Sequence, residues 1–299
     1  MDYLTSDYQR FISSVTEEVE TLLDEAHEIR VTPVRKNNGV RLMSMGIFKK
    51  GTPSSPTIYL ERYYREYKIG RSLRQIAEEI VRTYREVEDG PGIDINTIFD
   101  AAHVLDRVVC RLISHARNQE LLEEVPHREF LDLSVVFCQM IESEHMGRGT
   151  VMVTHAQTKA WGIDEDQLME RAVSNMPNLM PVDFLTMSAM LQEFGSPEEM
   201  IGETAPLFIL TNTQRQYGAW WMSDDSTLRQ VSKALQGGFY LLPSSVHECI
   251  IVPGVLDTDP EELRDMVMHV NETHVLPQEY LSDTVYEYDC AREELKIAA

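Results

Sequence analysis

Hydrophobic and polar positions in the first 85 residues predict a helix, a β-hairpin and further helical segments. Apolar residues recur at helical spacing from about Ser6 to Ala26, with Ser6 as the N-cap. Residues 29–34 and 40–48 alternate around Asn37-Asn38-Gly39, a turn sequence because asparagine and glycine tolerate positive φ angles. The start of the chain is therefore expected to place helices beside a small antiparallel sheet.

From about residue 95 onward, the pattern predicts strands in pairs with helices between them. Residues 129–141 form one long apolar run, which predicts a single strand with Leu131, Leu133, Val135 and Phe137 on one face. Residues 182–194 are typical of a short amphipathic helix. The other predicted strands are 106–114, 150–156, 207–212, 239–243, 248–253, 283–289 and 294–298, and the other predicted helices begin near residues 95, 118, 164, 223 and 259.

Paired strands separated by helices indicate an α+β fold with mostly antiparallel sheets. Regular β-α-β alternation, which a doubly wound fold requires, does not occur. Acids, glycines and a proline interrupt two helical patterns between Glu86 and Asp94. We therefore predict two subdomains, a helix–hairpin–helix unit at residues 1–90 and a larger α+β unit at residues 91–299.

Charge is distributed unevenly along a chain whose formal net charge is −22. Residues 151–299 carry 24 acidic and 8 basic side chains, whereas residues 31–85 carry 12 basic and 4 acidic ones. The overall charge disfavours direct binding to nucleic acid or anionic lipid, and the basic stretch 31–85 is the one exception. The two regions could pair within one molecule, pair between protomers of a homo-oligomer, or contact an acidic partner.

Targeting and redox signals are few. The N-terminal residues lack the basic and apolar regions of a secretory signal, and 18 consecutive apolar residues occur nowhere, so a membrane span is not expected. A cytoplasmic location is the expectation.

The four cysteines are far apart without a C-x-x-C pair, which is typical of reduced thiols rather than of a disulfide or zinc framework.

The best candidate for a site lies between Phe208 and Pro253. Two apolar runs end in polar residues that could meet in space. The first run supplies Thr211 and the binding candidates Asn212, Gln214, Arg215 and Tyr217. The second run supplies Ser244 and the weak catalytic candidates Ser245, His247 and Glu248. If the site is enzymatic, His247 is the expected general base and Arg215 the expected anion-binding group.

Complete catalytic or metal-binding patterns are absent from the sequence. Ser245, His247 and Glu248 are too close in sequence to form a triad on one strand, and no G-x-S-x-G elbow occurs. No H-E-x-x-H motif occurs, and the glycines at Gly90 and Gly147 lack the residues of a nucleotide loop. Neither a metal nor a cofactor is expected.

Several blocks together resemble a family of domains of unknown function. They are PTIYLERYYREY, VPHREFLDLSVVF, GTVMVTHAQTKAWGID, LTNTQRQYGA, LPSSVHECIIVP and DTDPEELRDMVMHVNETHVLPQEYLSDTVYEYD, and they cover about residues 8 to 297. The resemblance implies a host among gut-dwelling anaerobic Gram-positive bacteria, where such genes often lie near mobile elements. More distantly, the C-terminal half resembles YtpQ-like proteins. The resemblance implies a full-length α+β unit and brings no catalytic residues.

These observations favour a non-catalytic binding or regulatory protein, with another protein as its partner and with a link to mobile-element or defence biology. Its acidic surface would then imitate nucleic acid. The alternative is a hydrolase-type enzyme with its site around Ser245, His247 and Arg215.

Overall fold

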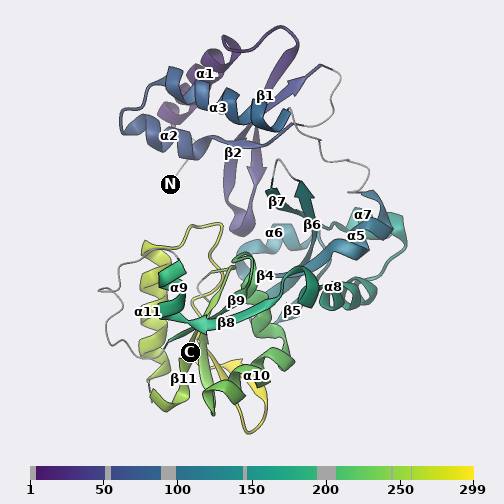
Figure 1. Cartoon of the computed structure of the whole chain (residues 1–299), viewed down its shortest axis with the longest axis vertical. Helices are drawn as coiled ribbons and strands as arrows, with labels where there is room; N and C mark the ends of the chain where they lie inside the picture. Colours follow the sequence, from purple (N-terminus) through teal and green to yellow (C-terminus); the bar gives the residue numbers. More distant parts are fainter. Residues whose placement is uncertain are drawn as a thin grey trace. The chain divides into compact units, whose positions relative to one another are not determined.

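The protein folds into an α+β structure of antiparallel sheets and covering helices, as predicted (Figure 1). The computed structural model describes residues 5–50, 55–88, 99–143, 147–193, 207–243, 245–256 and 258–299. The chain divides into two compact units. The N-terminal unit comprises residues 1–36, 40–98 and 141–149, and the C-terminal unit comprises residues 37–39, 99–140 and 150–299. The predicted boundary near residue 90 lies in the stretch 89–98, outside the described residues, and stays a prediction.

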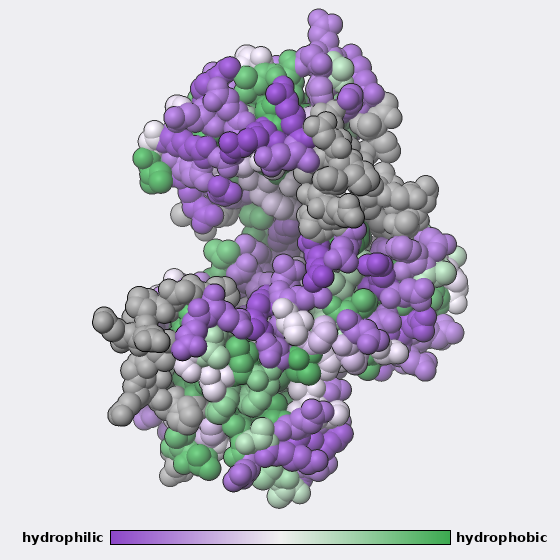
Figure 2. All heavy atoms as spheres, in the orientation of Figure 1, coloured by the Kyte–Doolittle hydropathy of each residue, from purple (hydrophilic) through white to green (hydrophobic). Residues whose placement is uncertain are grey.

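The described residues of the N-terminal unit form a three-stranded antiparallel sheet and three α-helices. The sheet has the order β1-β2-β3, and the turn between β1 and β2 contains Asn38 and Gly39 at φ angles of 60° and 67°, as the hairpin prediction requires. Hydrophilic side chains cover much of this unit on the face shown in Figure 2. Its elements are α1 (Ser6–Glu20), β1 (His27–Arg35), β2 (Arg41–Lys49), β3 (Ile58–Tyr59), α2 (Leu60–Lys68) and α3 (Leu73–Glu88).

A buried carboxylate joins three elements of the N-terminal unit. Glu61, in the first turn of α2, accepts hydrogen bonds from the hydroxyl of Tyr8 at 2.9 Å and from the amide of Met43 at 2.6 Å. Apolar side chains of α1, β2, α2 and α3 pack around it. Burial of these side chains, together with the two hydrogen bonds to one Glu61 oxygen, holds the helices against the sheet.

The C-terminal unit contains a six-stranded sheet of order β13-β12-β10-β11-β9-β8 and a smaller sheet in which β6 pairs with β4, β5 and β7. Helices and 3-10 turns connect the strands, and α11 packs against one side of the larger sheet through Leu263 and Val267. The strands are β4 (Val108–Ser114), β5 (His127–Phe130), β6 (Leu133–Ser143), β7 (Gly147–Met152), β8 (Val182–Thr186), β9 (Phe208–Asn212), β10 (Phe239–Leu242), β11 (Cys249–Pro253), β12 (Tyr286–Asp289) and β13 (Glu294–Ile297). The helices are α5 (Ala101–Arg107), α6 (Gln119–Leu122), α7 (His155–Trp161), α8 (Glu165–Leu179), α9 (Met187–Glu193), α10 (Asp225–Leu235) and α11 (Pro260–Thr273), and the 3-10 turns include η2 (Ala116–Asn118) and η4 (Gly218–Ser223).

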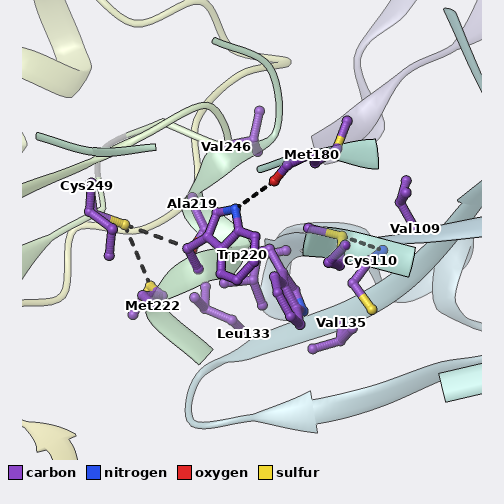
Figure 3. Packing of buried hydrophobic residues seen from close by; sticks show 14 of the residues in the cluster. Val109, Cys110, Leu133, Val135, Met180, Ala219, Trp220, Met222, Val246 and Cys249 are labelled. Carbon is purple, nitrogen blue, oxygen red and sulfur yellow. Dashed lines mark hydrogen bonds between the residues drawn. The ribbon is translucent and has the colours of Figure 1, made fainter. Parts of the chain in front are cut away.

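One apolar core joins both sheets of the C-terminal unit and extends from Val104 to Tyr288. Figure 3 shows Cys249 pointing toward Met222 and Ala219 inside it, with the two sulfur atoms 3.8 Å apart. Three of the four cysteines are buried, and Cys290 is exposed. Burial raises the pKa of the Cys138 and Cys249 thiols, because a low-dielectric environment disfavours the thiolate.

Asp132 connects the smaller sheet to the C-terminal segment. It accepts hydrogen bonds from the hydroxyls of Ser282 at 2.9 Å and Thr284 at 3.0 Å, and from the hydroxyl of Tyr286. These donors lie at least 150 residues further along the chain. One carboxylate therefore fixes the position of the segment that leads into β12.

The prediction of a single strand at residues 129–141 is wrong. The run folds instead into the antiparallel hairpin β5–β6, in which Phe130 pairs with Leu133. Leu131 turns the chain with a φ angle of 54°, and its side chain is 43% exposed rather than part of a buried face. Hydrophobicity alone could not reveal this turn, because leucine seldom adopts the left-handed conformation.

The prediction of one helix at residues 182–194 is also wrong. Residues Val182–Thr186 form β8, which pairs with β9, and only Met187–Glu193 are helical. Pairing with a neighbouring strand overrides a weak helical pattern in so short a segment. One predicted helix end shifts as well: Thr5 rather than Ser6 caps α1. Gln236, at a φ angle of 58°, turns the chain after α10.

Candidate functional site

His247 lies in the loop between β10 and β11, where residues 211–218 hold it in place. The hydroxyl of Thr211 and the amide of Gly218 donate to the carbonyl oxygen of His247 at 2.8 and 2.9 Å. The amide of Tyr217 donates to the imidazole Nδ1 at 3.3 Å. One neighbouring segment therefore fixes both the backbone and the ring of His247.

The segment that holds His247 is a tight loop organised by Asn212. The fully buried Asn212 side chain accepts the amide of Gln214 at 3.0 Å and donates to the carbonyl oxygen of Gln216 at 2.6 Å. Arg215 and Tyr217 adopt left-handed φ angles of 56° and 54°. Such angles are uncommon for residues other than glycine and persist only where the surroundings impose them.

Gly218 is required by the close approach of three backbone segments. A Cβ atom at this position would lie 2.4 Å from the Thr211 Oγ1, 2.6 Å from the His247 carbonyl oxygen and 2.7 Å from the Asn212 amide nitrogen. A larger residue would separate the loop from His247. The absence of a side chain is therefore what allows the two segments to hydrogen-bond.

Tyr217 contacts both an imidazole and a guanidinium group. Its ring stacks on that of His247, with centroids 5.5 Å apart and planes inclined by 25°. The guanidinium carbon of Arg111 lies 4.3 Å from the centre of the Tyr217 ring. Arg111 is the one partly exposed residue of β4, whose other residues are buried. Its Nε atom is buried and has no hydrogen-bond partner, and no carboxylate in the described part of the chain forms an ion pair with it.

His247 is neutral at physiological pH. Burial, aided by the positive charge of Arg111, lowers the pKa of its imidazole to about 4. Because Nδ1 accepts the Tyr217 amide, the neutral ring carries its proton on Nε2, which lies 3.8 Å from a carboxylate oxygen of Glu279. The side chain of His247 is 24% exposed, so a ligand can reach it.

Two partly buried glutamates, Glu248 and Glu279, lie near His247. Burial raises the pKa of the Glu279 carboxyl. Burial, together with the negative charge of Glu279, also raises the pKa of Glu248, although hydrogen bonding with Ser245 opposes the shift. The hydroxyl of Ser245 accepts the amide of His247 at 3.0 Å. This contact is not the serine-to-imidazole hydrogen bond that an activated nucleophile needs.

The other binding candidates contact different partners. Arg215 forms ion pairs with Asp183 at 2.7 Å and with Glu193 at 2.8 Å, while its backbone belongs to the Asn212 loop. Gln214 donates to the carbonyl oxygen of Leu179. Both side chains therefore connect the loop to β8, α9 and the end of α8, whereas Thr211 and Tyr217 contact His247 directly. Ser244 lies outside the described residues.

Within the described ranges, no group of three or more histidine, cysteine or acidic residues could hold a metal ion. Over the same residues, no helix is long and apolar enough to cross a lipid bilayer.

Reasoning from the sequence missed Arg111 and Glu279. A signal for Arg111 was present, since it is the lone charged residue in the apolar run VVCRLIS. A charge inside a buried strand needs a partner or a ligand. Glu279 offered no comparable signal, because it lies in a polar loop after α11 and reaches His247 only through the fold.

A family model described as "Family of unknown function (DUF5688)" matches residues 8–290 of this chain. A search of curated proteins found no match, and neither did a comparison with solved structures.

Proposed function

The chain belongs to the DUF5688 family of unknown function, and we propose that it is a non-catalytic protein that binds an anionic ligand. The site is in the C-terminal unit, at Arg111, Tyr217 and His247. A carboxylate or phosphate group is the part of the ligand that these residues recognise.

The unpaired Arg111 guanidinium supports this proposal most directly. The sequence contains 49 acidic and 27 basic residues, yet no carboxylate of the described ranges pairs with Arg111. Its Nε atom has lost contact with water without gaining a protein partner. A buried donor left unsatisfied costs about 1–3 kcal/mol, a cost that a bound anion would remove.

The geometry around Arg111 suits a planar anion. The Tyr217 ring lies against the guanidinium, and a guanidinium can bind two oxygens of one carboxylate or phosphate along its N–H edge. Neutral His247 adds an Nε2–H donor in the same cluster without adding charge. Because the imidazole does not gain a proton near neutral pH, it can donate to the anion over a wide pH range.

The wider role that we propose is regulatory. The net charge of −22 supports an acidic surface that imitates nucleic acid and contacts a basic protein partner. The basic stretch 31–85 offers a second contact for an acidic partner or for another copy of the chain. The sequence resemblance supports a bacterial host and a link to mobile elements or defence.

A hydrolase centred on Ser245 and His247 is the alternative, with Arg215 as its anion-binding group. It has less support from the contacts, because Ser245 bonds a backbone amide and the ion pairs of Arg215 already neutralise its charge. Hydrolysis of a chromogenic ester that depends on both Ser245 and His247 is the result that would favour this alternative.

Titration of the purified full-length protein with acetate and inorganic phosphate, followed by NMR, tests the binding site. We expect saturable shifts that the R111Q variant loses, whereas R264Q, which changes an exposed arginine on α11, binds as the wild type does. An R111K variant keeps the charge and should retain weak binding. Equal binding by wild type and R111Q, or no binding by the wild type, overturns the proposal.

A further inference from the structure

A second arginine–tyrosine pair lies in the same unit. The guanidinium carbon of Arg117, in η2, is 3.6 Å from the centre of the Tyr280 ring. Arg117 is exposed, unlike Arg111 with its buried Nε, and neither arginine forms an ion pair with a carboxylate of the described residues. Burial is the main cause that raises the pKa of Tyr280 to about 12, so its ring stays uncharged at physiological pH. The Tyr280 hydroxyl also hydrogen-bonds with the side chain of Asp283, so the pair combines one positive charge and a neutral aromatic ring with a carboxylate nearby.

Both pairs are connected to the loop that carries His247. Tyr217 donates its amide to the His247 ring, while Tyr280 forms an isolated β-bridge with Ser245. The amide of Val246 donates to the carbonyl oxygen of Glu279, the residue before Tyr280, at 2.8 Å. Hydrogen bonds thus hold both tyrosines against one short loop.

The two arginines come from one continuous segment, which limits the distance between them. Arg111 lies in β4, and Arg117 follows in the 3-10 turn η2 just after the strand ends. Three residues of strand and one short turn separate the two Cα atoms by about 10–15 Å. This distance exceeds the size of one carboxylate or phosphate group.

Glu279 places negative charge beside His247, next to Tyr280 along the chain. Its carboxylate lies 3.8 Å from the His247 Nε2, and its backbone adjoins Tyr280. The carboxyl of Glu248 is close enough for Glu279 to influence its pKa. A ligand with charge along its whole length, such as a nucleic-acid strand, would be repelled here, whereas an uncharged middle would not.

We infer that the ligand is a small linear molecule with an anionic group at each end and an uncharged middle, the class of the long-chain dicarboxylates. One end binds Arg111 beside Tyr217, and the other binds Arg117 beside Tyr280. The inference rests on the proposed anion site and adds a second contact to it. A second charged contact in one molecule increases affinity because the second binding event is intramolecular.

The test compares monocarboxylates with linear dicarboxylates of increasing length, using calorimetry on the full-length protein. We expect one range of lengths to bind at least about tenfold more tightly than the monocarboxylate of equal length. R117Q should lose this gain but keep the monocarboxylate site at Arg111, whereas R111Q should lose both the gain and that site. R264Q again serves as the control, and NMR spectra confirm that each variant is folded.

The outcomes separate the two proposals. If R117Q leaves dicarboxylate affinity unchanged, or if affinity does not depend on length, the two-ended ligand is wrong while the anion site at Arg111 stands. If the wild type binds neither acid, both proposals are wrong. If a short oligonucleotide or tripolyphosphate binds more tightly than every dicarboxylate and needs both arginines, the inference that the ligand has an uncharged middle is wrong.

Discussion

The imidazole of His247 stacks on the phenol ring of Tyr217, with 5.5 Å between the ring centroids. The same two residues share a hydrogen bond from the Tyr217 amide to the His247 Nδ1. Tyr217 reaches this position only through a left-handed backbone conformation. Tyr217, in its strained backbone conformation, therefore covers the imidazole of His247 and also fixes its tautomer.

Acidification should destabilise the protein through His247. The pKa of its imidazole is lowered to about 4 in the folded state, whereas an unfolded histidine titrates near 6.5. Between these values only the unfolded chain binds the proton, so the free energy of unfolding falls as the pH decreases from about 6.5 to about 4, by about 3 kcal/mol in total. Urea unfolding of wild type and H247Q at several pH values measures this loss. A pH dependence that is identical in both proteins contradicts the assignment.

Removal of the Glu279 charge should strengthen anion binding. The carboxylate lies near His247 and opposes a negative ligand, so E279Q should bind acetate about two- to fivefold more tightly at neutral pH and low salt. Burial raises the pKa of Glu279, so its ionisation disfavours the folded state as the pH rises above its ordinary value. E279Q should therefore also unfold at a higher temperature than the wild type at pH 8. Weaker acetate binding by E279Q would mean that Glu279 helps to hold the ligand.

Gly218 and Gly237 form a matched pair of substitutions. G218A places a methyl group against the Thr211 hydroxyl and the His247 carbonyl oxygen, and should cost about 2–4 kcal/mol of folding free energy. A Cβ atom added at Gly237 would meet no neighbouring atom within 4 Å, so G237A should change stability by less than about 1 kcal/mol. Chemical unfolding of both variants provides the comparison. Similar stabilities would show that the loop can separate from His247 at little cost.

Loss of the Asp132 carboxylate should leave three hydroxyl groups without their acceptor. D132A is expected to lose about 3 kcal/mol of folding free energy, because the donors lie in a partly buried network. D166A removes an acidic side chain that is 86% exposed and should change stability by less than about 0.5 kcal/mol. Thermal unfolding distinguishes the two. Hydrogen exchange should also be faster at residues 282–289 in D132A alone.

Cysteine reactivity should report on the core. Cys290 is exposed, whereas the other three cysteines are buried, and burial raises the pKa of each buried thiol. A disulfide reagent should therefore modify one thiol quickly in the folded protein and all four after unfolding. C290S should abolish the fast phase. A second fast thiol in C290S would show that the core opens readily.

Features set by neighbours in the sequence could be predicted. The Asp164 side chain accepts the amide of Gln167 at 2.9 Å, and the Gln167 side chain accepts the amide of Asp164 in return, as the local sequence indicates. The Asn38-Gly39 turn and the strands β9, β10 and β11 were likewise visible in the pattern. In the candidate site, the meeting of Tyr217 with His247 falls in the block that the sequence singled out.

Features set by distant residues could not be predicted. Val182–Thr186 becomes a strand because β9 lies beside it, and Leu131 turns because β5 must fold back on β6. The three partners of Asp132 lie at least 150 residues away. Arg111 joins Tyr217 only after two sheets have packed together, so hydrophobic periodicity indicated its burial but not its neighbours.

The strand order of the larger sheet has a consequence for the synthesis of the protein on the ribosome. Strand β10 pairs with β11 on one side and with β12 on the other, and β12 begins at Tyr286. A nascent chain therefore carries β10 with one side unpaired until β12 has been synthesised. We expect the larger sheet to stay incomplete during that interval, and the nascent chain to depend on chaperones more than a protein built from local contacts does.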